Sequence, residues 1–347
     1  MSDHQKPLKR YITKTVMLTL ALILLVTGLF PPLTAGAHLS VFNPPPGTLN
    51  LQSVSSATVT SAAISADDNY TYLVVSSTQP VTFTFGYSRN AVNITINQAH
   101  SFPTSVHMGA NPIFSSAQWN GSTITLNLTT QDGFMGYHGY RDSAGNLVVR
   151  FRNPPSSIWV TRVVIDPGHG GQDRGAEGFR RDMPEVVINR HIASFLAEDL
   201  RNRGATVLVL DTSRGMELAE RVRRAEEFNA DFFISVHNNA SRNANATGTE
   251  VFFFTQFSSV LAATVSRNVS QQLNTNNRRG RRARFAVTRS TQFQSILVEG
   301  GFMTNRAEYE KLINPHYQQA IATGIADAIE AVVAHSYPGT GRMARIG

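Results

Sequence analysis

The chain contains no cysteine among its 347 residues. This absence excludes disulfide bonds, iron–sulfur clusters, thiol catalysis and metal sites with cysteine ligands. Any metal must therefore be bound by histidine and carboxylate side chains. Charged residues are also few, at 16%, and apolar residues make up 41%. This composition excludes both a disordered chain and a protein with many membrane spans.

Negative charge is the scarcer sign. The chain has 31 lysine and arginine residues against 24 aspartate and glutamate residues, which gives a net charge of +7. A positive balance indicates an acidic partner without identifying it. At roughly 150 residues per domain, the length predicts about two domains.

The longest apolar run, Val16 to Phe30, lies near the start of the chain. Basic residues precede it, and the small residues of Ala35-Gly36-Ala37 follow it. This layout is typical of a secretory signal peptide, so we predict that residues 1–37 are a signal peptide cleaved after Ala37. The run is shorter than the roughly 20 residues of a membrane span, and the chain would be membrane-anchored only if the segment stayed uncleaved. We expect an exported protein of the cell wall, the extracellular space or the periplasm.

Residues 38–155 are rich in serine, threonine and asparagine and poor in charge. Short segments alternate apolar and polar residues, which is the period of a half-buried strand, and turn residues separate them. We therefore predict a small all-β domain of antiparallel strands over residues 38–155. The alternating apolar sets are Val81, Phe83 and Phe85; Val92, Ile94 and Ile96; and Ile124, Leu126 and Leu128.

Residues 156–347 alternate expected strands with expected helices. This rhythm predicts an α/β fold in which helices cover both faces of a sheet. On the second helix we expect Leu218, Val222 and Ala225 to face inward. The expected strands are Arg162–Asp166, Thr206–Leu210, Asp231–Val236, Glu250–Phe254 and Ile296–Val298, and the expected helices are Met183–Arg203, Glu217–Asn229, Val260–Leu273 and one or two helices within Tyr309–Ala334.

Four residues occupy positions where chemistry is expected. His169, His237 and Glu299 follow expected strands, and Glu185 begins the expected helix after the first of these strands. Each also has an ordinary structural interpretation. The histidines could be polar residues at chain exits. Glu299 breaks the expected strand Ile296–Val298, and it could simply be paired with a cation. Asp182 and Glu185 have the spacing of a helix capping box.

Taken together, the four residues indicate a metal site. The carboxyl ends of parallel strands meet at one edge of a sheet, where binding sites collect. Two histidines and one carboxylate with an open fourth position are the ligand set of a catalytic zinc ion, and a second carboxylate is then needed to accept a proton from water. The spacing alone does not say which glutamate is the ligand.

The motifs around these residues resemble those of the zinc-dependent N-acetylmuramoyl-L-alanine amidases, the amidase_3 family, from about Arg162 to about Val333. The motifs agree in order and spacing. They are Asp166-Pro167-Gly168-His169-Gly170-Gly171 with Asp173, Gly175 and Ala176; Glu185 at the head of a helix; Ser235-Val236-His237-Asn238-Asn239-Ala240; Gly248-Thr249-Glu250-Val251; and Leu297-Val298-Glu299-Gly300-Gly301-Phe302-Met303-Thr304-Asn305.

The resemblance implies that His169, Glu185 and His237 bind Zn²⁺ and that Glu299 is the catalytic glutamate. It also implies a mixed sheet with helices on both faces. The family cleaves the amide bond between N-acetylmuramic acid and L-alanine in peptidoglycan. Two alternatives remain open: a zinc peptidase acting within the stem peptide, and a catalytically inactive wall-binding protein. Many members have alanine where this chain has Asn238, and we expect this difference to be tolerated.

Four further expectations concern partners and regulation. The catalytic part has no spare helical segment of the kind that blocks the zinc in some members, so we expect an open site. The β domain is similar in size and strand pattern to the AMIN-type domains that localise such enzymes on the wall.

A run of basic residues suggests contact with anionic wall polymers or with substrate carboxylates. A plain solvated loop is the alternative. Nucleic-acid binding is disfavoured because no aromatic residues are interleaved with the arginines. We expect a monomer. The run comprises Arg278, Arg279, Arg281, Arg282 and Arg284.

Overall fold

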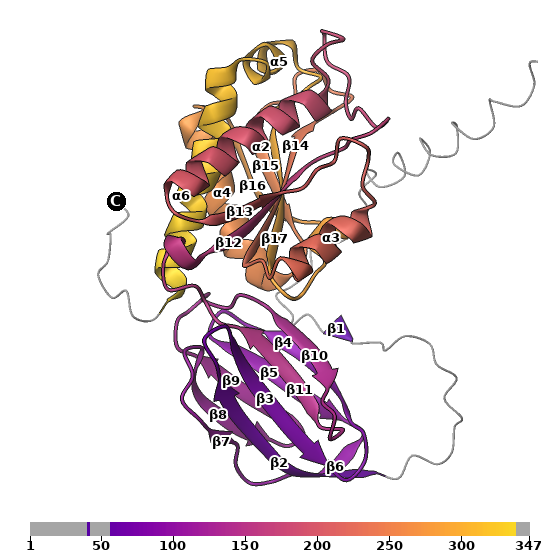
Figure 1. Ribbon diagram of the computed structural model, residues 1–347, viewed down its shortest axis with the longest axis vertical. Coiled ribbons are helices and arrows are strands. Elements are labelled where there is room, and N and C mark those ends of the chain that lie inside the picture. Colours follow the sequence, from indigo (N-terminus) through magenta and orange to yellow (C-terminus); the bar gives the residue numbers. More distant parts are fainter. Residues whose placement is uncertain (1–39, 42–55, 338–347) are drawn as a thin grey trace, which may run out of the picture. The chain divides into compact units, whose positions relative to one another are not determined.

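The computed structural model describes residues 40–41 and 56–337 (Figure 1). The predicted signal peptide, residues 1–37, lies outside the described residues. Within the described part of the chain, no helix is long and apolar enough to cross a membrane.

The first part of the chain is β-rich, as predicted. Its strands form two sheets in the orders β1-β4-β5-β9-β8 and β10-β11-β3-β2-β6, with β7 beside β2. The neighbours are antiparallel except for β6 and β7, which run parallel to β2. The strands are β1 (Ser40–Val41), β2 (Ala57–Ala66), β3 (Tyr70–Ser77), β4 (Thr82–Tyr87), β5 (Ala91–Asn97), β6 (Ala99–Ser101), β7 (His107–Met108), β8 (Phe114–Asn120), β9 (Thr123–Leu128), β10 (Tyr137–Arg141) and β11 (Leu147–Arg152).

The predicted alternation explains which face of these strands is buried. Phe83 and Phe85 of β4 and Ile94 of β5 are all buried, while the residues between them are more exposed. Because successive side chains of a strand point to opposite faces, one side of each strand enters a shared core. The apolar spacing therefore determined which face is buried.

The second part of the chain is a six-stranded mixed sheet in the order β13-β12-β14-β17-β15-β16. Strands β13, β12, β14 and β17 are parallel, and β15 is antiparallel to β17 and parallel to β16. This confirms the predicted mixed α/β fold. The strands are β12 (Arg162–Pro167), β13 (Thr206–Val209), β14 (Phe232–Asn239), β15 (Thr249–Phe253), β16 (Asn277–Arg282) and β17 (Gln294–Phe302).

Helices cover both faces of this sheet, but unequally (Figure 1). Val163 and Ile165 of β12 belong to a large core with the buried sides of α2, α4 and α6. Val164, between them, belongs to a smaller core with Ala225 of α3. Strands buried on both faces must be apolar on both. The helices are α2 (Glu185–Asn202), α3 (Leu218–Glu227), α4 (Ser259–Gln272), α5 (Arg306–Leu312) and α6 (Pro315–Ser336), and the 3₁₀ turns are η1 (Ile158–Val160), η2 (Gln256–Ser258) and η3 (Ala286–Thr288).

The inward face of α3 differs from the sequence expectation. Leu218 is 51% exposed, whereas Arg221 is buried together with Ala225. The assignment of Leu218 to the core was therefore wrong. The reason is that the guanidinium of Arg221 has a buried anionic partner, Asp166. The helix therefore turns Arg221 inward, although the apolar pattern predicted Leu218 there.

The β-rich region contacts the amino ends of the mixed sheet through buried polar side chains. Arg152 of β11 forms an ion pair of 3.1 Å with Asp231, which directly precedes β14. The side-chain amide of Gln294, the first residue of β17, donates to the carbonyl of Phe134 at 3.0 Å. Burying a polar group is costly unless it is paired. Here each partner comes from a different part of the chain, so these two pairs connect the β-rich region with the mixed sheet.

Candidate metal centre

His169 lies in the loop that leaves β12. Its backbone has a positive φ of 68°, which places this residue in the left-handed region that non-glycine residues seldom occupy. The Nδ1 atom is 2.8 Å from Oδ2 of Asp173, and this leaves Nε2 directed toward Glu185 at 3.0 Å. A carboxylate on one ring nitrogen fixes the tautomer that presents the other nitrogen as a metal ligand.

Glu185 is the first residue of α2 and is only 4% exposed. Its Oε2 atom accepts a hydrogen bond from the backbone of Ala176 at 2.8 Å, and its Oε1 atom lies 3.0 Å from Nδ1 of His237. Burial alone would raise the pKa of this carboxyl, but hydrogen bonds and charge from His169 and His237 hold the pKa well below its usual range. Glu185 is therefore an anion facing two imidazoles.

The capping-box interpretation of Glu185 is wrong. The residue before the helix is Pro184, which makes no side-chain capping bond. Asp182 instead pairs with Arg180 at 2.6 Å on the surface. A capping box places its glutamate three residues after the cap, whereas Glu185 directly follows Pro184, and its carboxylate faces the two histidines instead.

His237 comes from β14 and is partly buried. The sequence placed it after a strand ending at Val236, but β14 continues to Asn239. The strand continues because its neighbour β17 also extends further and pairs with it, with His237 opposite Glu299. The side chain thus projects from regular sheet structure rather than from a loop.

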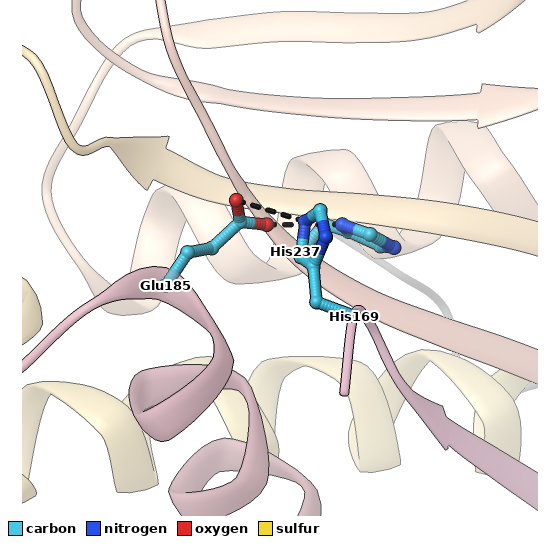
Figure 2. A group of neighbouring side chains, drawn as sticks. All are labelled: His169, Glu185 and His237. Carbon is cyan, nitrogen blue, oxygen red and sulfur yellow. Dashed lines mark hydrogen bonds and ion pairs between the residues drawn. The ribbon is translucent and has the colours of Figure 1, made fainter. Parts of the chain in front are cut away.

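The structure brings three of the four candidate residues together (Figure 2). The ligand atoms of His169, Glu185 and His237 all lie within 4.8 Å of one another. Figure 2 shows the Glu185 carboxylate directed at both imidazoles. The backbone makes room for the group at Gly168 and Gly175, where a Cβ atom would overlap the His237 ring and the Glu185 carboxylate, respectively. Two imidazoles and a carboxylate converging in this way fit a zinc ion with an open fourth position.

The electrostatics of the group also fit a cation site. Burial lowers the pKa of His169, but hydrogen bonds and charge from Glu185 and Asp173 outweigh it and raise the pKa to about 9. In the absence of metal, a proton on His169 therefore neutralises part of the negative charge of the group. A metal cation bound here would take the place of that proton.

Glu299 is the fourth candidate and lies within β17, not beyond it. The prediction that it breaks the strand was wrong, since β17 runs through it to Phe302. In the sheet register it stands between His237 of β14 and Glu250 of β15. Its Oε2 atom is sealed from solvent and has no hydrogen-bond partner among the described residues. Burial and the negative charges of Glu185 and Glu250 raise the pKa of Glu299 well above its usual range.

Sequence reasoning missed the buried ion pair that holds the His169 loop. The guanidinium of Arg221 lies 2.7 Å from Asp166 and donates to the carbonyl oxygen of His169 at 2.9 Å. The other oxygen of Asp166 accepts from the hydroxyl of Ser235 at 2.7 Å. The signal that could have identified this pair is a charged residue at an inward helical position beside an aspartate at the end of a buried strand.

The basic run forms a strand where a solvated loop was one expectation. Residues Asn277–Arg282 are β16, at the edge of the mixed sheet. Arg281 forms an ion pair with the buried carboxylate of Glu250, and Arg278 lies 3.8 Å from the same group. Part of the basic run therefore compensates a carboxylate that stands beside Glu299.

Comparison with known proteins identifies the family. Residues 163–331 match the N-acetylmuramoyl-L-alanine amidase family, Amidase_3. The sporulation-specific N-acetylmuramoyl-L-alanine amidase of Bacillus subtilis (strain 168) is 30% identical over 177 residues, which cover 49% of this chain and 68% of that protein. N-acetylmuramoyl-L-alanine amidase LytC of the same strain is 33% identical over 170 residues, covering 48% of this chain but only 34% of LytC.

A solved structure is similar over the same part of the chain. The catalytic domain of CwlV, an N-acetylmuramoyl-L-alanine amidase from Bacillus (Paenibacillus) polymyxa var. colistinus, has 30% identity and a TM-score of 0.49, and the match covers 51% of this chain and 99% of that domain. All four candidate residues lie within residues 163–331, the range that the family model matches. On the evidence of the family model and the sporulation-specific amidase, the chain belongs to the N-acetylmuramoyl-L-alanine amidase family, whose catalytic domain it carries in its C-terminal half.

Proposed function

We propose that this protein is a zinc-dependent hydrolase of peptidoglycan that cleaves the amide bond between N-acetylmuramic acid and the L-alanine of the stem peptide. The observation that carries the proposal is the convergence of His169, Glu185 and His237, with Glu299 next to His237 in the sheet register. Membership of the family supplies the substrate class, because its members are N-acetylmuramoyl-L-alanine amidases.

The three converging residues would hold the zinc ion. Once bound, zinc would polarise the scissile carbonyl and make a water molecule more acidic. The protein's own contribution is to fix the ligands: Asp173 orients the His169 ring, and the backbone of Ala176 holds the Glu185 carboxylate. Such fixed partners keep the ligand geometry ready for the reaction.

Glu299 would act as the general base and then as the general acid. Its side chain would take a proton from the attacking water and return it to the leaving amine of L-alanine. A carboxylate transfers protons best when its pKa lies near the working pH. Burial and the neighbouring charges of Glu185 and Glu250 move the pKa of Glu299 in that direction.

The remaining parts of the chain have roles that follow from this function. An enzyme of peptidoglycan must be exported, which agrees with a signal peptide over residues 1–37. We assign residues 38–155 to a wall-targeting domain and residues 156–347 to the catalytic domain. The exposed arginines of β16 offer a contact for anionic wall polymers, since a guanidinium binds carboxylates and phosphates through two parallel bonds.

Digestion of purified peptidoglycan, with and without a chelator, tests the proposal. Mass spectrometry should find intact stem peptides released from glycan, and the chelator should abolish this release. A zinc peptidase would instead leave truncated peptides on the glycan. Full zinc content without any hydrolysis would identify an inactive wall-binding protein and overturn the proposal.

A further inference from the structure

Two buried side-chain amides lie beside the metal-binding residues. Asn189 is one helical turn after Glu185 on α2, and Asn238 directly follows His237 on β14. The two residues are 0% and 2% exposed. The Nδ2 atom of Asn238 donates to Oδ1 of Asn189 at 2.9 Å, so the two amides form one bridge between helix and sheet.

The bridge contacts all three segments that carry the candidate ligands. The Nδ2 atom of Asn189 donates to Oε1 of Glu185 at 3.3 Å and to the carbonyl of Gly168, the residue before His169, also at 3.3 Å. The backbone N–H of Asn238 donates to Oε1 of Glu185 at 3.1 Å. This oxygen, which also faces His237, is therefore held from the helix and from the sheet at once.

Packing alone does not explain the presence of the bridge. A buried amide is unfavourable unless its polar atoms are paired, and Oδ1 of Asn238 has no partner among the described residues. The neighbouring strand accommodates this amide only through Gly300, because a Cβ atom there would come within 2.9 Å of the same oxygen. A small apolar residue would fill the position of Asn238 without an unpaired buried acceptor.

We propose that Asn189 and Asn238 are positioning residues that fix the orientation of the Glu185 carboxylate toward the metal. Asn238 acts through Asn189: by occupying Oδ1 of Asn189 with a donor, it turns the Nδ2 group toward Glu185. Without Asn238, the Asn189 amide could rotate and present its oxygen to the carboxylate. The inference rests on the proposed zinc site and adds to it two residues that do not bind the metal.

Zinc affinity of the full-length protein, measured by competition with a chromogenic chelator, tests the proposal. Asn189→Ala should weaken binding by about 10- to 100-fold, the range typical for partners of metal ligands. Asn238→Ala should weaken it less, by about 5-fold, which corresponds to one hydrogen bond. The double variant should bind zinc no more weakly than Asn189→Ala, because Asn238 acts only through Asn189.

A matched control separates positioning from the loss of any buried amide. Gln318 of α6 is 1% exposed, and its amide donates to the carbonyl of Leu312, which precedes that helix. Gln318→Ala should lower thermal stability but leave zinc affinity within about twofold, since the buried hydrogen bond that it removes involves no candidate ligand and neither residue of the bridge. Visible absorption of the cobalt-loaded protein should change for Asn189→Ala and not for Gln318→Ala.

Unchanged zinc affinity and an unchanged cobalt spectrum in Asn189→Ala would overturn the inference, as would losses that multiply in the double variant. Should Asn189→Ala fail to fold, Asn238→Ala decides, because it keeps the backbone bond to Glu185 and removes only the contact with Asn189. Failure of the unmodified protein to bind zinc would instead refute the proposed function, so the two failures are distinguishable.

Discussion

Arg221 of α3 forms an ion pair of 2.7 Å with Asp166 at the end of β12, and both side chains are buried. The same guanidinium donates to the carbonyls of Pro167 and His169 at 3.2 and 2.9 Å. It therefore fastens the backbone on both sides of Gly168, where His169 adopts its left-handed conformation. A residue that would not bind metal itself thus supports the loop that presents a proposed ligand.

Replacing Arg221 should destabilise the whole catalytic domain. Arg221→Ala leaves Asp166 buried without its cation, and breaking a buried pair on one side typically costs about 3–5 kcal/mol. Arg223→Ala on the same helix is the matched control. Its side chain is 52% exposed in its pairs with glutamates, and ion pairs on the surface contribute little, so its loss should cost much less than the loss of Arg221. Urea unfolding of both variants measures the difference, and equal losses would contradict the role given to Arg221.

Replacing Glu299 with glutamine should stop hydrolysis while zinc stays bound. The change keeps the size of the side chain but removes its ability to accept a proton, and general acid–base catalysis contributes about 10²- to 10⁴-fold. We expect kcat to fall by about 10²-fold or more, while the zinc content of the protein stays unchanged. Glu198→Gln, an exposed position on α2, should have full activity. Near-normal turnover of Glu299→Gln would rule out its role as the base.

The zinc-free protein should lose stability as the pH rises from about 6.5 to 9. Folding raises the pKa of His169 from an ordinary value of 6.5 to about 9, because Glu185 and Asp173 outweigh the effect of burial. A base with a raised pKa contributes stability that is complete below its unfolded pKa and is lost as the pH rises through its folded pKa. Urea midpoints in the presence of a chelator should show this decline.

His169→Gln provides the control for this pH effect, because glutamine does not titrate. The difference in stability between the unmodified protein and His169→Gln should shrink between pH 6.5 and 9. Zinc affinity of the unmodified protein should rise over the same interval, since zinc must displace the proton on His169. A difference that stays constant with pH would show that His169 does not carry the raised pKa.

Removing the negative charge of Glu250 should shift the pH profile of the reaction. Glu250 raises the pKa of Glu299 through its charge, so Glu250→Gln should lower that pKa. A base with a lower pKa is ionised at lower pH, and the acidic limb of kcat/KM should therefore move to lower pH. The acidic limb reports the essential base of the free enzyme. A limb that stays in place would mean that Glu250 acts on Arg281 and the edge strand alone.

Much of the architecture could be predicted from local patterns. The alternating apolar residues of β4 and β5 defined their buried face. Successive side chains of a strand point to opposite faces, and the polar face stays in contact with water. The alternation of strands and helices after residue 156 indicated a covered sheet. Short-range rules failed at the ends of elements: β14 and β17 run further than their apolar cores because they pair with each other there.

The sequence by itself determined which residues carry the proposed chemistry. The absence of cysteine left only histidine and carboxylate ligands, and the motifs around His169, Glu185, His237 and Glu299 pointed to zinc. Tertiary structure alone decided how these side chains are held. The Arg221–Asp166 pair joins residues 55 positions apart, and the Asn189–Asn238 bridge joins residues 49 positions apart. Neither follows from periodicity, because a buried polar group is stable only where the fold brings it a partner.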